Sequence, residues 1–233
     1  MVSFRDNLPS SPGPGVNPVT PHAFVERFGR EQASAILRTD DQEKAALAME
    51  AAIRGGFTII EFTLSIPGAF DLVREFSQRD GLVVGTGTVM DEHQARQSVA
   101  AGARFLVSPV VDEAVIAAAE ELEVASMPGC HTPTEMLRAY RAGAQLCKLF
   151  PAPADGPAWV RSVLGPLPHL KIVPTNGVDE HNAGEWIAAG AFAVGFVATL
   201  FHSADIAAGN WDAIEARARR CLAAARTGNR VSN

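Results

Sequence analysis

The sequence predicts one (β/α)8 barrel of the TIM type, an α/β fold, preceded by a short N-terminal helix. Eight short runs of apolar and β-branched residues recur along the chain, as is typical of strands buried on both faces of a parallel sheet. Ala-rich stretches with capping residues at their starts and Gly at their ends separate the runs and predict helices. No G-x-G-x-x-G turn follows any run, so a closed barrel is favoured over a doubly wound open sheet.

The expected elements follow one another at regular intervals. An amphipathic helix, PHAFVERFGREQA (21–33), comes first, and another, at 211–226, closes the chain. We expect strands at 34–39, 58–64, 82–89, 104–110, 124–130, 144–150, 170–178 and 191–201. The helices between them are expected to start at the N-caps Asp40, Asp91, Asp112, Asp179 and Thr132, the last in a capping box with Glu135. They are expected to end at Gly55/Gly56, Gly102, Gly143 and Gly190, each suited to the left-handed conformation.

The predicted domain organisation is simple. Residues 1–20 are rich in Pro, Gly and Ser and predict a flexible segment with no secretory signal. A single barrel domain spans 21–226, and 227–233 form a C-terminal tail.

Composition excludes several classes of partner. The 233 residues are 47% apolar and 20% charged, with a net charge of −6, which argues against binding to nucleic acid or an anionic membrane. No apolar stretch is long enough to span a bilayer. The three cysteines are widely spaced and suit neither a zinc site nor a disulfide framework, so reduced thiols in the cytoplasm are expected.

Lys148 is the most informative residue of the chain. It is one of only three lysines, and in AQLCKLFPAP (144–153) it stands between an apolar run and a proline-rich turn. Apolar neighbours remove its hydration and lower the pKa of its amine, and a neutral amine can form a Schiff base with a carbonyl. The alternative is a structural lysine that reaches to solvent from a strand end or pairs with a carboxylate.

Glu61 complements this lysine. It is the only charged residue in the apolar run TIIEFTL (58–64). If it points into the barrel, burial raises the pKa of its carboxyl toward the range where it can both accept and donate protons. The alternative is a structural carboxylate paired with a cation, for which Lys148 is the obvious partner.

Barrel enzymes place their active sites where the strands end, so residues at these ends are candidates for substrate contacts. Besides Lys148 and Glu61, the candidates at strand ends are Arg38, Thr88, Pro109, Pro128, Phe150, Thr175 and Asn176. They form no cluster of His and carboxylates that would hold a divalent metal. One amine and one carboxylate at such ends favour imine-based carbon–carbon bond chemistry without metal or cofactor.

Six segments occur in order along the chain: EFTLSIPGAF, VGTGTV, AGARFLVSP, PGCHTPTE, CKLFPAP and VPTNGV. Together they resemble the 2-keto-3-deoxy-6-phosphogluconate aldolase family, which also includes 2-keto-4-hydroxyglutarate and 2-keto-3-deoxy-6-phosphogalactonate aldolases, over roughly residues 34–201. The resemblance implies a class I aldolase, a lyase that cleaves a 2-keto-3-deoxy-4-hydroxy acid to pyruvate and an aldehyde. It names 2-keto-3-deoxy-6-phosphogluconate, 2-keto-4-hydroxyglutarate or both as substrate, and implies a homo-oligomer, a trimer in many relatives.

The resemblance also implies residue roles. Lys148, in the KLFP motif, forms the Schiff base, Glu61 is the acid/base group, and Thr88 helps to hold the pyruvyl carboxylate. The loop after the fifth strand, which lines the same pocket, contains Pro128, Gly129 and Thr132.

The chain departs from the family pattern at two places. Many relatives have an arginine shortly after the glutamate, where this chain has Ser65, and Arg38 is expected to supply that positive charge. The expected phosphate-binding turns read Thr175-Asn176-Gly177 and Gly195-Phe196-Val197-Ala198, and their larger side chains crowd an anion cradle made of backbone N–H groups.

Other functions stay open on the sequence alone. They are an aldolase or decarboxylase for an unphosphorylated 2-keto acid, a barrel that binds a keto acid without turnover, and a sugar-phosphate isomerase on the same fold.

Overall fold

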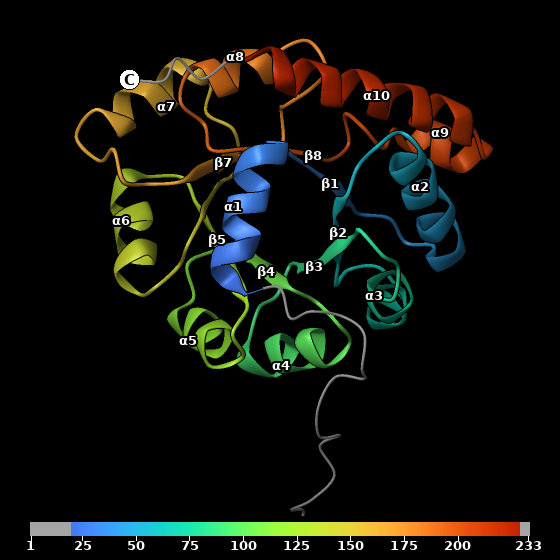
Figure 1. The fold of residues 1–233 in the computed structure, drawn as a ribbon, viewed down its shortest axis with the longest axis horizontal. Helices are drawn as coiled ribbons and strands as arrows, with labels where there is room; N and C mark the ends of the chain where they lie inside the picture. The colour runs from blue at the N-terminus through green and yellow to red at the C-terminus, as the bar shows by residue number, and fades with distance from the viewer. Residues whose placement is uncertain (1–19, 229–233) are drawn as a thin grey trace, which may run out of the picture.

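The computed structural model describes residues 20–228 of the chain, and Figure 1 shows their arrangement. The strands are β1 (Ala33–Leu37), β2 (Ile59–Thr63), β3 (Val83–Gly87), β4 (Phe105–Ser108), β5 (Ala125–Cys130), β6 (Cys147–Leu149), β7 (Ile172–Pro174) and β8 (Val194–Phe196). The helices are α1 (Pro21–Glu31), α2 (Gln42–Arg54), α3 (Ala69–Ser77), α4 (Glu92–Ala100), α5 (Glu113–Glu121), α6 (Pro133–Arg141), α7 (Pro157–Leu164), α8 (Ala183–Ala188), α9 (Ser203–Ala208) and α10 (Trp211–Thr227).

The strands form one parallel sheet in the order β7-β6-β5-β4-β3-β2-β1-β8. The sheet closes where Thr175 bridges to Gly195 and where the Phe192 N–H donates to the Ile172 carbonyl oxygen at 2.8 Å. The helices surround the ring, as Figure 1 shows. The predicted (β/α)8 barrel is therefore confirmed, and each strand falls within its expected range except that β1 begins one residue early.

Helix α1 covers the N-terminal end of the barrel and crosses the centre of the ring in Figure 1. Its apolar face buries Phe24 and Phe28, which pack with lumen residues such as Ile59 and Met127 in one cluster. The Phe24 ring stacks on that of Phe105 with centroids 4.6 Å apart. A second apolar cluster lies between the outer faces of the strands and the surrounding helices. With one end of the lumen closed by α1, the strand C-termini are left as the open mouth.

The helix ends follow the predicted chemistry with three corrections. Gly56, Gly102, Gly143 and Gly190 all take positive φ, as expected, whereas Gly55 stays right-handed. The N-cap of α2 is Asp41 rather than Asp40, because the Asp41 side chain accepts from the Lys44 N–H at 2.9 Å. Asp179 does not cap α8. It caps a separate turn just before that helix, and Asn182 takes the N-cap position.

Two expectations lie mostly beyond the described residues. The N-terminal segment 1–20 reaches them only at Thr20, the N-cap of α1, and the tail 227–233 only at its first two residues. Helix α10 ends at Thr227, one residue later than expected. Among the helices of residues 20–228, none has the length and apolar character needed to cross a membrane.

Candidate active site

Lys148 occupies the centre of β6, and its side chain is half-buried. Its Nζ lies 5.1 Å from the centroid of the Phe150 ring. Within residues 20–228 the Lys148 Nζ atom forms no hydrogen bond and no ion pair within 4.0 Å. Burial lowers the pKa of the Lys148 amine, the charge of Glu61 raises it in part, and the charge of Arg38 lowers it further. The neutral, nucleophilic form is therefore favoured compared with an exposed lysine.

Glu61 is completely buried in β2. Among the described residues, neither of its carboxylate oxygens has a hydrogen-bond partner. Burial raises the pKa of the Glu61 carboxyl, while the charges of Lys148 and Arg38 lower it in part. A buried, unpartnered carboxyl is costly, so its presence favours a group that exchanges protons with a ligand over a structural one.

Gly87, at the end of β3, makes room for that carboxyl. A Cβ added at Gly87 would overlap Glu61 Oε1. The register pairs Gly87 with Thr63, two residues beyond Glu61 on the same strand. Sequence reasoning did not identify this residue, although a glycine inside a strand next to the one that carries the glutamate is a usable signal of close approach.

Arg38 and Thr88 meet over the mouth of the barrel. Arg38 follows β1, and its Nη2 donates to Thr88 Oγ1 at 2.9 Å. Thr88 follows β3 and takes a positive φ of 62°, which is uncommon for a β-branched residue and often marks a functional position. Because Thr88 Oγ1 accepts this bond, its own hydrogen remains available for a ligand oxygen.

The expected residues of β4 and β5 lie beside the lysine. Gly129 pairs with Lys148 in the register, and Pro128 pairs with Ser108. A Cβ at Gly129 would overlap the carbonyl oxygen of Pro109. The glycine therefore lets the chain after β4 approach the strand that adjoins β6.

The expected residues of β7 and β8 lie across the seam of the barrel. Thr175 is buried, and its Oγ1 has no hydrogen-bond partner within residues 20–228. An added Cβ at Gly195 would be 2.7 Å from Thr175 Cγ2 and 2.7 Å from Ile36 Cδ1. Ile36 in turn pairs with Glu61, so Thr175 and Gly195 belong to the same part of the lumen as the buried carboxyl.

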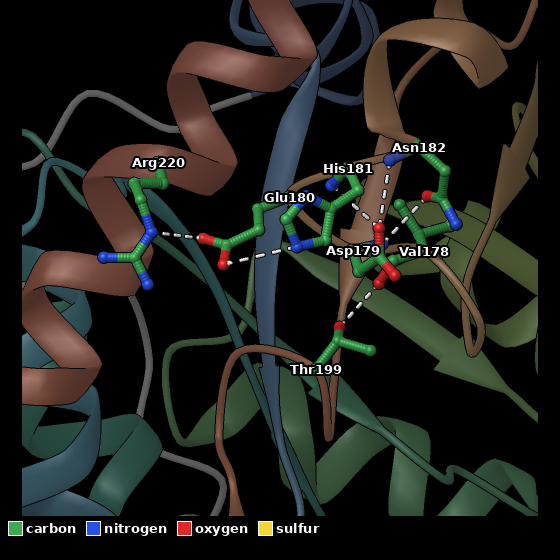
Figure 2. A network of polar contacts seen from close by, with 7 residues as sticks. All are labelled: Val178, Asp179, Glu180, His181, Asn182, Thr199 and Arg220. Carbon is green, nitrogen blue, oxygen red and sulfur yellow. Dashed lines mark hydrogen bonds and ion pairs between the residues drawn. The ribbon is translucent and has the colours of Figure 1, made fainter.

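Asn176 and Gly177 follow Thr175 in an exposed turn with positive φ at both positions. Figure 2 shows the polar network that holds the next residues. Asp179 Oδ1 accepts from the backbone N–H groups of His181, at 2.8 Å, and Asn182, at 2.9 Å. Asn182 Nδ2 donates back to the Gly177 carbonyl oxygen at 2.8 Å. The network therefore fixes the turn from its C-terminal side.

Two further contacts of Figure 2 tie this loop to its surroundings. Thr199 Oγ1, in the segment after β8, donates to the Val178 carbonyl oxygen at 2.5 Å. Arg220 Nε, on α10, donates to Glu180 Oε2 at 2.5 Å. The loop after β7 is thus attached both to the segment after β8 and to the outer helix.

Thr132 and Phe150 lie farther out. The Thr132 side chain is exposed and forms the predicted capping box, accepting from the Glu135 N–H at 3.3 Å and donating to Glu135 Oε2 at 3.0 Å. Phe150 is 38% exposed at the rim. The Phe150 ring adjoins Lys148, whereas the Thr132 hydroxyl is already occupied by the helix cap.

No group of His, Cys, Asp or Glu side chains within residues 20–228 is placed to bind a metal ion. What converges instead is an amine of lowered pKa, a carboxyl of raised pKa, and an arginine with a hydroxyl. An arrangement of this kind can bond covalently to a carbonyl, move protons, and hold a carboxylate.

Comparison with known proteins gives a consistent result. The family model for KDPG and KHG aldolases matches residues 26–217. A 2-dehydro-3-deoxy-phosphogluconate aldolase of Pseudomonas aeruginosa is 32% identical over 204 residues, 86% of this chain and 92% of its own. A 2-dehydro-3-deoxy-6-phosphogalactonate aldolase of Escherichia coli is 31% identical over 177 residues, 72% of this chain and 84% of its own. A KDPG aldolase of Legionella pneumophila, solved with pyruvate captured as a covalent carbinolamine, has a TM-score of 0.76 at 28% identity and covers 88% of this chain and 97% of its own.

Proposed function

The chain belongs to the KDPG and KHG aldolase family, and from this we propose that Lys148 and Glu61 catalyse cleavage of a 2-keto-3-deoxy-4-hydroxy acid to pyruvate and an aldehyde. The protein is then a class I aldolase, a lyase that works through a Schiff base. The observation that carries the residue assignment is the completely buried Glu61 carboxyl without a hydrogen-bond partner within residues 20–228, together with the half-buried Lys148 amine whose charge acts on it.

The reaction begins at the C2 ketone. The neutral Lys148 amine attacks C2, and the oxygen takes up a proton to give a carbinolamine. Glu61 supplies the proton with which the hydroxyl leaves as water, and a protonated imine remains. Burial supports both roles, because it favours the neutral form of the amine and of the carboxyl.

The imine then acts as the electron sink for cleavage. The C4 hydroxyl loses its proton, the C3–C4 bond breaks, and its electron pair moves to C3 and the imine nitrogen, so that an aldehyde leaves and an enamine remains. Protonation of C3 regenerates the imine, and water releases pyruvate from Lys148. Glu61 is the buried carboxyl that exchanges protons in these steps.

Arg38 and Thr88 are proposed to hold the carboxylate of the substrate. The Thr88 hydroxyl accepts from Arg38 Nη2 and is free to donate, so both groups offer hydrogens to one anion. Such anchoring fixes C2 relative to the amine. Thr175, Gly129 and Gly195 complete the lumen around the substrate. We also propose a cytoplasmic homotrimer, supported by the family and by the three free, buried cysteines.

Borohydride reduction in the presence of pyruvate tests the nucleophile. We expect a stable adduct on the peptide that contains Lys148, and its loss in Lys148→Ala, with kcat/KM for aldol cleavage reduced by roughly 10⁴-fold or more, as when other covalent nucleophiles are removed. With only three lysines in the chain, peptide mass mapping assigns the site without ambiguity.

Lys171→Ala is the matched control, since Lys171 directly precedes β7 and its Nζ lies 5.9 Å from the ring of Phe192, outside the set of residues assigned here. This variant should keep both the adduct and the activity. An undiminished adduct in Lys148→Ala would contradict the assignment, and a protein that binds pyruvate without forming any adduct would be a non-catalytic barrel.

A further inference from the structure

A cavity of about 750 Å³ adjoins the reaction centre on the side of β1 and β8. Ile36 and Arg38 line its inner end, the connection from β1 to α2 lines one wall, and the segment from Val197 through α9 lines the other. Ile36 pairs with Glu61 and Arg38 reaches Thr88, so this cavity continues outward from the proposed carboxylate anchor and the buried carboxyl. Neither Lys148 nor Glu61 lines it.

The position of the cavity suits the part of the substrate beyond C4. A 2-keto acid bonded to Lys148, with its carboxylate at Arg38 and Thr88, has the remaining carbons directed elsewhere in the mouth. The cavity between the ends of β1 and β8 is large enough for a short chain of carbons, since ligand pockets typically measure about 300–1,000 Å³.

The charges along this cavity cancel. Its lining contains two cationic side chains, Arg38 and Lys44, and two carboxylates, Asp40 and Asp41. Lys44 Nζ lies 3.9 Å from Asp41 Oδ2, and Arg38 is directed to Thr88. His202 also lines the cavity and lies 3.8 Å from Asp205. Lys44 is therefore paired with a carboxylate of the protein itself, and Arg38 belongs to the proposed anchor for the substrate carboxylate.

Asp40 is the exception among the charged groups of the cavity. Within residues 20–228 its side chain forms no hydrogen bond and no ion pair, and it is exposed. Across the cavity, Val197 and Ala198 present apolar side chains. A phosphate dianion would meet a free carboxylate and no free cation here, whereas a hydroxyl can donate to Asp40.

We infer that this cavity binds an uncharged, hydroxylated chain, and that the enzyme prefers 2-keto-3-deoxy sugar acids without a terminal phosphate, with Asp40 as the hydroxyl acceptor. This inference rests on the aldolase function proposed above and specifies its substrate class. The aldehyde product is then a neutral hydroxyaldehyde.

The test compares kcat/KM for 2-dehydro-3-deoxygluconate and its 6-phosphate, and for the same pair epimeric at C4, so that stereochemistry does not conceal the effect. We expect the free acids to be preferred by at least about tenfold, a difference of about 1.4 kcal/mol. Asp40→Asn should reduce this preference by at least about tenfold, mainly through a higher kcat/KM for the phosphorylated substrate, because it removes the repelling charge.

Glu43→Gln is the matched control. Glu43 is an exposed carboxylate in the first turn of α2, three residues after Asp40, and does not line the cavity, so its loss should leave the preference unchanged. Thermal unfolding of both variants verifies that each is folded. Preference for the phosphorylated substrates, or equal preference ratios in Asp40→Asn and the wild type, would overturn the inference.

Pyruvate alone separates this inference from the aldolase proposal. Exchange of the pyruvate methyl protons for solvent deuterium requires Schiff-base and enamine formation but no distal chain. If exchange occurs while the phosphorylated substrates are preferred, or while none of the four substrates is cleaved, only the inference about the cavity fails. If exchange and the borohydride adduct are both absent, the aldolase proposal itself fails.

Discussion

Lys148 has two charged neighbours of opposite sign, and each acts on the pKa of its amine in a different direction. The Glu61 carboxylate raises this pKa because it stabilises the ammonium, and the Arg38 guanidinium lowers it because it repels the ammonium. Burial, the largest influence, also lowers it. The fraction of neutral amine at a given pH therefore depends on all three residues.

Schiff-base formation, followed as a function of pH, should fall on the acid side as the Lys148 amine is protonated. Substitution of either neighbour should move the pH of this fall, called here the acid limb. In Glu61→Gln the stabilising charge is lost, so the pKa of Lys148 falls and the limb shifts to lower pH. In Arg38→Gln the repulsion is lost, so the pKa rises and the limb shifts to higher pH. Borohydride trapping of pyruvate across a pH series, with the adduct quantified by mass spectrometry, measures both shifts.

Arg30→Gln serves as the control for these measurements. Arg30 is exposed on α1, which covers the opposite end of the barrel, and its substitution should leave the limb in place. Shifts of the same sign in Glu61→Gln and Arg38→Gln would contradict the electrostatic account. Glu61→Gln should also slow the turnover of cleavage, since a carboxyl that moves protons typically contributes about 10²–10⁴-fold.

The sequence predicted the residues that differ most from their surroundings. Lys148 and Glu61 are isolated charges in apolar runs, and a charge in such a place has few explanations. Gly87 was not predicted, because its role depends on the side chain that it faces on the neighbouring strand. Asp40 was expected as a helix cap, and a shift of one residue to Asp41 is what leaves its carboxylate free.

At the scale of single elements, α1 has the clearest structural role. It lies outside the repeating strand–helix units, and its two buried phenylalanines fill the end of the lumen opposite the active site. The sequence predicted this helix from its amphipathic pattern but could not predict where its apolar face would pack, since periodicity identifies a buried face without identifying its partner.

Phe24→Ala should destabilise the barrel strongly without changing its chemistry. Removal of a fully buried ring that stacks on Phe105 leaves a cavity, for which we expect a loss of about 3–5 kcal/mol in the free energy of unfolding. Urea denaturation measures this loss. The folded fraction should still form the pyruvate adduct, because the site lies at the other end of the strands.

Glu26→Ala, an exposed change on the same helix, is the comparison for Phe24→Ala and should alter stability by no more than about 0.5 kcal/mol. A small loss in Phe24→Ala, similar to that of Glu26→Ala, would show that α1 does not contribute to the core as its packing indicates.

The strand boundaries show why sequence prediction was less accurate at the mouth of the barrel. The apolar runs at 144–150, 170–178 and 191–201 were read as whole strands, yet β6, β7 and β8 contain three residues each. The residues that follow these strands within the runs lie in the loops that carry Phe150, Thr175 and Val197. Some of them, such as Val178 and Leu200, are buried in the core, and an apolar run alone does not separate such loop residues from a strand.

At the scale of the whole molecule, the closure of the barrel is uneven. β2 and β3 are paired along their full length, from Ile59 with Val83 to Thr63 with Gly87. β7 and β8 are joined by the bridge from Thr175 to Gly195 and by the hydrogen bond from Phe192 to Ile172. Eight strands were predictable from eight apolar runs, but the place of the weakest pairing was not, because it depends on the register between β7 and β8.

Hydrogen exchange should therefore be fastest, among the strands, along the β7–β8 seam. Backbone N–H groups at a sparsely paired seam become exposed to solvent by smaller local unfolding events than those in the middle of a fully paired sheet. The peptides that cover 172–175 and 192–196 should therefore exchange before those of β2 and β3. Mass spectrometry of the folded protein in water without denaturant measures the order.

Pyruvate should slow exchange at this seam more than in β2 and β3. Lys148 lies on β6 next to the seam, and a covalent ligand stabilises the closed state that binds it. Equal protection of all eight strands, or earliest exchange in β2, would contradict a barrel that opens first between β7 and β8.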